Sequence, residues 1–118
     1  MSRWKPDRAA QVIIGNVLYE IHPDDVARSD RSIRRRLRYR GFSYDPGQVE
    51  QLRRVKDWLK EEIGLFGRSR YFLGSKNGTY ASAEDFDVPR MVADCRAAFP
   101  DVPLADIEEI ALYVYWER

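Results

Sequence analysis

The clearest hydrophobic pattern in the chain is helical and lies between residues 45 and 64. Apolar residues recur there every three or four positions, which predicts one buried helix face: Val49, Leu52, Val55, Leu59 and Ile63. Asp45 followed by Pro46, with Gln48 three residues after the aspartate, is typical of a helix start. Gly64 is typical of a helix end. The pattern therefore predicts a helix of about five turns.

The N-terminal part of the chain has a different pattern. Gln11–Ile14 and Val17–Ile21 are short, β-branched and apolar, and Gly15-Asn16 separates them. Two such segments joined by a two-residue turn of this kind predict a β-hairpin. A second hairpin is predicted where a four-residue turn, Ser75-Lys76-Asn77-Gly78, separates Arg70–Leu73 from Thr79–Ala81.

A further helix is expected between these two regions. Pro23, Asp24 and Asp25 suit the first turn of a helix, and Ser29 or Asp30 would serve as a second starting point. Gly41 would end this helix after Arg40. The pattern leaves open whether residues 36–44 are helical or form a strand.

The C-terminal third is predicted to contain a pair of helices. The first follows Asp87, and its apolar face comprises Val88, Met91, Val92, Cys95, Ala98 and Phe99. Pro100-Asp101 turns the chain, and a second apolar stripe follows, made of Leu104, Ile107, Ile110, Ala111 and Val114. Leu112–Trp116 is rich in β-forming residues, so a strand is the alternative for the tail.

These elements together predict a single α+β domain over residues 1–118. It would be a small antiparallel sheet from two β-hairpins, packed by about four helices; an all-α core with short hairpins is the alternative. The length favours one domain, and no apolar run approaches the ~20 residues that span a bilayer. No signal-peptide pattern precedes the apolar segments, so we expect a cytoplasmic protein without a membrane partner.

Charge changes this picture, because it is distributed unevenly. Seven arginines fall between Arg28 and Arg40, within thirteen residues. Residues 1–70 carry a net charge of +6 and residues 71–118 a net charge of −5, so the overall charge of +1 conceals two oppositely charged parts. A cluster of like charges this dense is costly unless an anion or an acidic partner compensates it.

If residues 26–38 form a helix, most of their arginines lie on the side opposite their apolar residues. With Ile33 at zero and about 100° per residue, Val26, Ile33 and Leu37 fall within about 40° of one another. Five arginines fall on the opposite side, between roughly 100° and 220°: Arg28, Arg31, Arg34, Arg35 and Arg38. If residues 37–44 form a strand instead, Arg36, Arg38 and Arg40 share one face.

We therefore predict a phosphate-binding site with aromatic residues beside it. Its arginines would be Arg28, Arg31, Arg34, Arg35, Arg38 and Arg40, and its stacking residues Tyr39, Phe42 and Tyr44. The function expected is that of a small, non-enzymatic accessory protein binding nucleic acid or another phosphorylated anion. The alternative is a protein-interaction or inhibitor module that docks an acidic partner, or forms a homo-oligomer through its basic and acidic parts.

Catalysis has little support in the sequence. His22 is the single histidine and Cys95 the single cysteine, so no metal site or nucleophile–base pair is apparent. We expect no catalytic residues, no metal and no cofactor. A small enzyme would require carboxylates that converge on His22.

Two short segments resemble motifs of known families. Val12-Ile13-Ile14-Gly15-Asn16-Val17 and Arg40-Gly41-Phe42-Ser43-Tyr44 resemble the two ribonucleoprotein motifs of RNA-recognition-motif domains, a resemblance that implies two strands and RNA as the ligand. This sequence departs from the family in having Ile13 at a position of base stacking and Asp45-Pro46-Gly47 where the second strand continues. His22-Pro23-Asp24 matches the tripeptide of J-domain co-chaperones, which follows a basic amphipathic helix in that family; a hairpin is predicted before it here.

Overall fold

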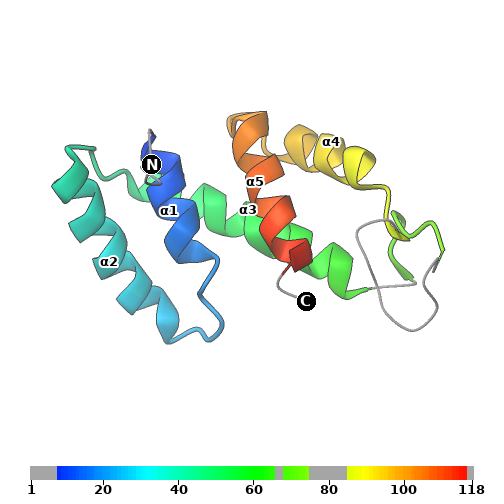
Figure 1. Cartoon of the computed structure of the whole chain (residues 1–118), viewed down its shortest axis with the longest axis horizontal. Coiled ribbons are helices and arrows are strands. Elements are labelled where there is room, and N and C mark those ends of the chain that lie inside the picture. The colour runs from blue at the N-terminus through cyan, green and yellow to red at the C-terminus, as the bar shows by residue number, and fades with distance from the viewer. Residues whose placement is uncertain (1–7, 66–67, 75–84, 117–118) are drawn as a thin grey trace, which may run out of the picture. The chain divides into compact units, whose positions relative to one another are not determined.

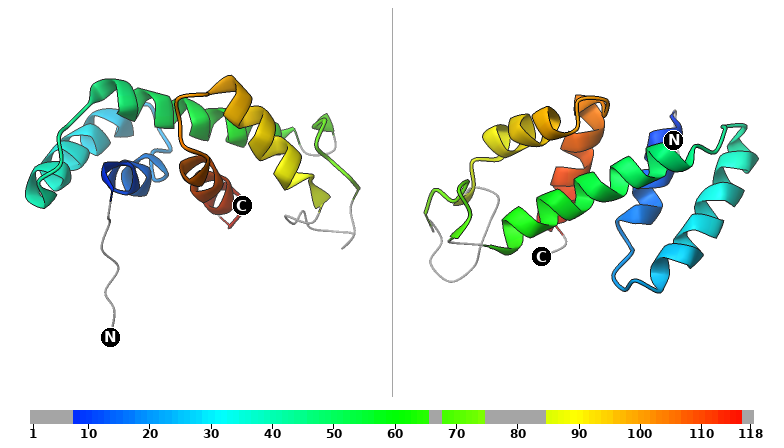
Figure 2. Two further views of the ribbon diagram at one scale, coloured as in Figure 1. Left: turned by 90° about the horizontal axis from the view of Figure 1, so that it is seen from above. Right: turned by 180° about the vertical axis from the view of Figure 1, so that it is seen from behind.

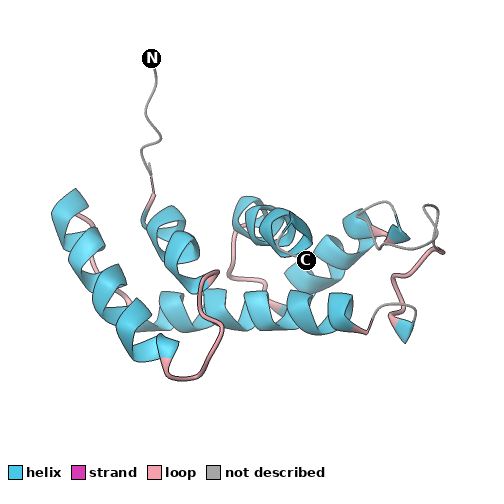
Figure 3. Ribbon diagram, turned by 60° about the horizontal axis from the view of Figure 1, so that its bottom comes forward, coloured by secondary structure: helices cyan, strands magenta, loops and turns pink. Residues whose placement is uncertain are grey.

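The structure is a computed structural model that describes residues 8–65, 68–74 and 85–116. In these residues it contains five α-helices (Figure 1): α1 (Ala9–Val17), α2 (Asp25–Arg40), α3 (Pro46–Gly64), α4 (Val88–Ala98) and α5 (Leu104–Trp116). No β-strand occurs in the described residues (Figure 3), where the only β pairing is an isolated antiparallel bridge between Phe72 and Phe86. The α+β prediction is therefore wrong, because the described residues contain five helices and no sheet.

The chain divides into two compact units, residues 1–53 and residues 54–118, and the boundary falls within α3. In the first unit the chain reverses after α1, and α2 runs back beside it (Figure 2). In the second unit α4 and α5 pack against each other. The prediction of one domain over residues 1–118 stays a prediction.

The first predicted hairpin is wrong: residues 9–17 form helix α1, and residues 18–21 lie in the turn that follows it. Ala10, Ile13, Ile14 and Val17 are all at most 4% exposed, and their spacing is helical rather than alternating. A helix that is apolar on most sides is stable when its surroundings bury it, and this burial outweighs the β-preference of its residues. Asn16 fits the helix because its side-chain Nδ2 donates a hydrogen bond to the Val12 carbonyl oxygen at 2.8 Å.

This correction also affects the two resemblances. The first ribonucleoprotein-like segment lies in α1, so it is not a strand, and the second spans the end of α2 and the loop after it. A helix does precede His22-Pro23-Asp24, contrary to our prediction, but no Lys or Arg occurs between Ala9 and Val17. It is therefore not the basic helix of the J-domain pattern.

Helix α2 confirms the predicted helix up to Arg40 and resolves the open assignment of residues 36–44. Gly41 adopts a left-handed conformation, with φ of 79°. The Phe42 N–H donates to the Leu37 carbonyl at 2.9 Å, and the Gly41 N–H donates to the Arg38 carbonyl at 3.1 Å. This pair of bonds is a Schellman motif, which ends the helix and sets the direction of the following chain. Residues 42–45 form a loop.

Helix α3 begins and ends where its pattern predicts. The Asp45 carboxylate accepts a hydrogen bond from the Gly47 N–H at 2.9 Å, and the Asp45 carbonyl accepts one from Val49. The predicted apolar face is buried: Val49, Leu52, Val55, Leu59 and Ile63 are at most 2% exposed.

The second unit contains the other corrections. Arg70–Leu73 is not a strand of a hairpin: Phe72 bridges Phe86, and the partner predicted for it, Thr79–Ala81, lies outside the described residues. Residues 112–116 belong to α5, so the strand alternative for the tail is wrong. The predicted stripes of α4 and α5 are buried at their centres, namely at Met91, Val92, Cys95, Ile107, Ile110, Ala111 and Val114.

Candidate anion-binding face of helix α2

Helix α2 separates its apolar and basic residues as the sequence predicts. Ile33 and Leu37 are fully buried, whereas Val26, expected beside them, remains 37% exposed. All seven arginines of the helix are exposed. Because α2 stays helical to its end, Arg36 and Arg40 fall at about 300° and 340° from Ile33, away from the other five. We call those five residues the basic face: Arg28, Arg31, Arg34, Arg35 and Arg38.

Few carboxylates compensate the basic face. Arg34 Nε lies 3.5 Å from Asp30 Oδ2. The positive charge of Arg28 makes a minor contribution to lowering the pKa of Asp25. Within the part of the chain that the structure describes, no ion pair involves Arg31, Arg35 or Arg38. Arg38 favours the helix because it lies in the last turn, near the negative end of the helix dipole. Arg31 and Arg35 lie mid-helix, where the dipole gives no such stabilisation.

A hollow of about 430 Å³ lies at the C-terminal end of the basic face. It is lined by Arg34 and Arg38 from α2 and by the loop that follows the helix, Gly41, Phe42, Ser43 and Tyr44. Four of the nine predicted site residues are thereby brought together. We call this feature the Arg34–Tyr44 hollow. Phe42 and Tyr44 are half-buried in it, whereas Tyr39 lies on the helix surface and is 86% exposed.

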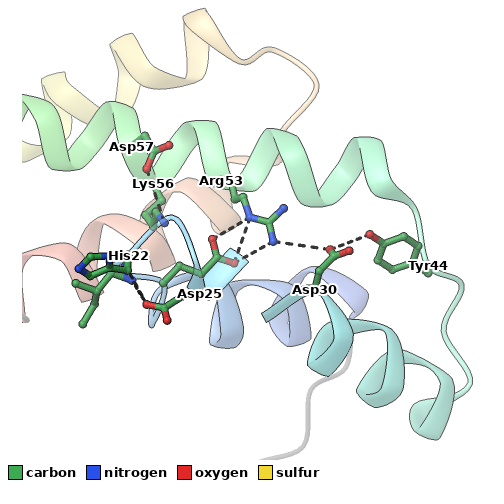
Figure 4. Close-up of polar contacts among 9 residues, drawn as sticks. His22, Asp25, Asp30, Tyr44, Arg53, Lys56 and Asp57 are labelled. Atoms are coloured by element: carbon green, nitrogen blue, oxygen red, sulfur yellow. Dashed lines mark hydrogen bonds and ion pairs between the residues drawn. The ribbon is translucent and has the colours of Figure 1, made fainter. Parts of the chain in front are cut away.

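One carboxylate, that of Asp30, holds the wall of this hollow in place. Its Oδ1 accepts a hydrogen bond from the Tyr44 hydroxyl at 2.9 Å and lies 3.8 Å from an Arg53 nitrogen, while its Oδ2 pairs with Arg34. Figure 4 shows Arg53 and Tyr44 on opposite sides of the Asp30 carboxylate. The Arg34 guanidinium carbon lies 4.3 Å from the centre of the Tyr44 ring, a cation–π distance. The Asp30 carboxylate and the Tyr44 ring thus both hold the guanidinium of Arg34 in position.

Arg53 extends this network to the end of α1. Its Nε and Nη2 donate to the Glu20 carboxylate at 2.9, 3.2 and 3.0 Å, and only 3% of the Glu20 side chain is exposed. The hydrogen bonds to Glu20 raise the pKa of Arg53 above its ordinary value, so the guanidinium remains charged. Burial and the hydrogen bond to Asp30 raise the pKa of Tyr44, so the phenol remains protonated and keeps donating. The sequence analysis identified neither Glu20 nor Arg53.

His22 lies in the turn between α1 and α2, close to the carboxylate of Asp25. Asp25 Oδ2 accepts hydrogen bonds from the backbone N–H groups of His22 and Ile21, at 2.9 and 3.1 Å, so this carboxylate ties the α1–α2 turn to the start of α2 (Figure 4). Cys95 is fully buried, and burial raises the pKa of its thiol to about 12.

In residues 8–65, 68–74 and 85–116, no group of three or more His, Cys, Asp or Glu side chains is arranged to hold a metal ion. In the same residues, no helix combines the length and apolar character needed to cross a membrane.

Comparison with protein-family models, curated proteins and solved structures finds no significant match to this chain. The basis for a function is therefore the geometry of α2 and the loop after it.

Proposed function

We propose that this chain is a non-enzymatic accessory protein that binds nucleic acid or another phosphorylated anion through the basic face of α2. The observation that supports this proposal is the exposure of five arginines along one side of one helix, four of them without an ion pair in the described residues. Guanidinium groups crowded in this way repel one another, and phosphates relieve the repulsion while accepting paired hydrogen bonds.

The size of the face suits several phosphates. Arg28 and Arg38 are ten residues apart, a distance of about 15 Å along a helix. Phosphates along one strand of B-form DNA are spaced by about 3.4 Å, so the face spans roughly four of them. With four phosphates neutralised on a single strand, the logarithm of the binding constant should fall with the logarithm of the salt concentration with a slope of about −2.8.

The test is fluorescence anisotropy of labelled oligonucleotides titrated with the full chain at 50 and 200 mM salt. The slope above predicts an affinity loss of about 50-fold between these two concentrations. Replacing Arg31 and Arg35 by glutamine should weaken binding and reduce the slope by about 1.4. The matched control replaces Arg36 and Arg40 by glutamine, which removes the same charge from the other side of the same helix.

The outcomes separate the proposal from its rivals. Equal losses in the two double variants would show that the protein responds to net charge and not to the basic face. An absence of binding at 50 mM salt would refute the proposal and favour the alternative function, a module that docks an acidic protein. Self-association through the net charges of +6 and −5 is a separate form of that alternative. It predicts a sedimentation coefficient that rises with protein concentration and falls back at high salt.

A further inference from the structure

The Arg34–Tyr44 hollow differs from the rest of the basic face in its chemistry. Along α2 the face presents guanidinium groups on a convex helix surface, suited to phosphates alone. At its C-terminal end it adds a concave space of about 430 Å³ with two aromatic residues in its lining. This volume is within the range of roughly 300–1,000 Å³ found for small-molecule sites. A phosphate by itself needs neither the aromatic rings nor so much space.

The lining of the hollow is ordered before any ligand arrives. The Schellman motif fixes the backbone of Phe42 through its bond to Leu37. Asp30 holds the Tyr44 hydroxyl and Arg34 Nε, and Arg34 lies over the Tyr44 ring. Preorganised groups of this kind lose little conformational entropy on binding.

Arg34 keeps a surface for a ligand although it has two partners. Its side chain remains 59% exposed, so the guanidinium is covered by Tyr44 without being enclosed. Unpaired nucleobases stack on planar guanidinium groups as they do on aromatic rings. A base placed on Arg34 would continue a stack that already contains Tyr44, with Phe42 in the same lining.

Arg38 connects the two parts, since it belongs to the basic face and also lines the hollow. A strand whose phosphates follow Arg31 and Arg35 toward Arg38 would bring its next nucleotide to the hollow. We propose that the hollow receives one unpaired base, and that the protein therefore prefers single-stranded nucleic acid to a duplex. This inference rests on the proposed function and specifies its ligand. In a duplex, the faces of the bases are stacked on one another and are not accessible to the hollow.

The experiment compares three probes on the full chain at one salt concentration. They are a labelled single-stranded oligonucleotide, the blunt duplex of the same sequence, and inorganic polyphosphate as a competitor without bases. Base stacking on one platform contributes a factor of about 5 to 150 in affinity. We expect the single strand to bind more tightly than the duplex by a factor in this range.

Two substitutions remove the stacking surface and leave the charge unchanged. Arg34→Lys keeps the positive charge but loses the planar guanidinium, and Phe42→Leu keeps an apolar side chain but loses the ring. Each should weaken single-strand binding by about 5-fold or more and leave polyphosphate binding within about 2-fold. The controls are Arg36→Lys, which makes the same change, and Tyr19→Leu, which also replaces an aromatic ring by an aliphatic side chain; both are at exposed positions of the same unit outside the hollow.

The results distinguish this inference from the proposed function. Equal affinity for single strand and duplex, or a single-strand preference that persists in Arg34→Lys and Phe42→Leu, would overturn the inference and leave phosphate binding by the basic face intact. Failure of all three probes to bind would overturn both. Loss of polyphosphate binding in Arg34→Lys would show that the guanidinium of Arg34 binds phosphate directly. That result would also contradict a stacking role for Arg34.

Discussion

Replacing Arg53 by methionine is expected to lower the free energy of unfolding by about 2–4 kcal/mol. The substitution keeps a long, flexible side chain and removes the guanidinium. Three donor–acceptor contacts of 2.9–3.2 Å to Glu20 disappear, together with the 3.8 Å contact to Asp30. Only 3% of the Glu20 side chain is exposed, so its carboxylate loses a cationic partner in a poorly solvated position.

The magnitude follows from burial. Removing one partner of a buried ion pair costs about 3–5 kcal/mol, because the remaining charge stays in a poorly solvated position. Arg53 retains 14% of its side-chain exposure, so water reaches the edge of this pair. Asp30 also keeps its bonds to Tyr44 and Arg34. Both facts place the expected loss around the lower end of that range and partly below it.

The assay is urea unfolding followed by circular dichroism on a double-mutant cycle of Arg53→Met, Glu20→Leu and the two together. The double variant has no buried charge to leave uncompensated, so it should be more stable than the sum of the two single losses implies. We expect a coupling free energy of at least about 1 kcal/mol. The slopes of the unfolding curves should remain similar, so that the change is one of stability.

Additivity of the two single losses within about 0.5 kcal/mol would refute this reasoning, because it would show that the residues act independently. A loss below about 1 kcal/mol for Arg53→Met would mean that the pair behaves as a solvent-exposed one.

Three further predictions concern local structure. Gly15→Ala should stabilise the protein by about 0.5–1 kcal/mol, because Gly15 is exposed within α1 and an added Cβ meets nothing within 4 Å; a lower melting temperature would contradict the helix. Backbone hydrogen bonds from His22 and Ile21 lower the pKa of Asp25, so its stabilising contribution is present above the pKa of the unfolded chain and is lost as the pH falls through the lowered pKa. Asp25→Asn should therefore flatten the acid limb of the stability–pH profile, and an unchanged limb would refute the role of this carboxylate. Burial raises the pKa of Cys95 to about 12, so a disulfide reagent should modify the thiol slowly in native protein and rapidly in urea. For the same reason, the free energy of unfolding should decline as the pH rises from the pKa of the thiol in the unfolded chain toward 12.

Much of the candidate site could be predicted from the sequence, because its determinants are local. The spacing of Ile33 and Leu37 identifies the buried side of α2, and the arginines opposite them follow from helix geometry. Gly41 marks the helix end because a left-handed residue is required there. The site residues themselves remain a prediction, since only binding experiments test them.

The network behind the site was not predicted. Asp30 and Arg34 are four residues apart, a spacing that signals an ion pair on a helix. No comparable pattern connects Glu20 with Arg53 or Asp30 with Tyr44, which are 33 and 14 residues apart. By charge alone, any of 19 Asp and Glu residues can pair with any of 20 Lys and Arg residues, and only the packing of α1, α2 and the start of α3 selects these partners.

The sequence by itself determined four of the five helices and the separation of charge along α2. Capping residues and apolar periodicity act within a few residues of each other, so α2, α3, α4 and the stripe of α5 could be recognised locally. The tertiary structure decided the state of residues 9–21. Val12, Ile13, Ile14 and Val17 suit a strand by intrinsic preference, and Gly15-Asn16 suits a turn. Burial on several sides at once favours a helix there, and that burial includes packing against α2, which the local pattern of residues 9–17 does not reveal.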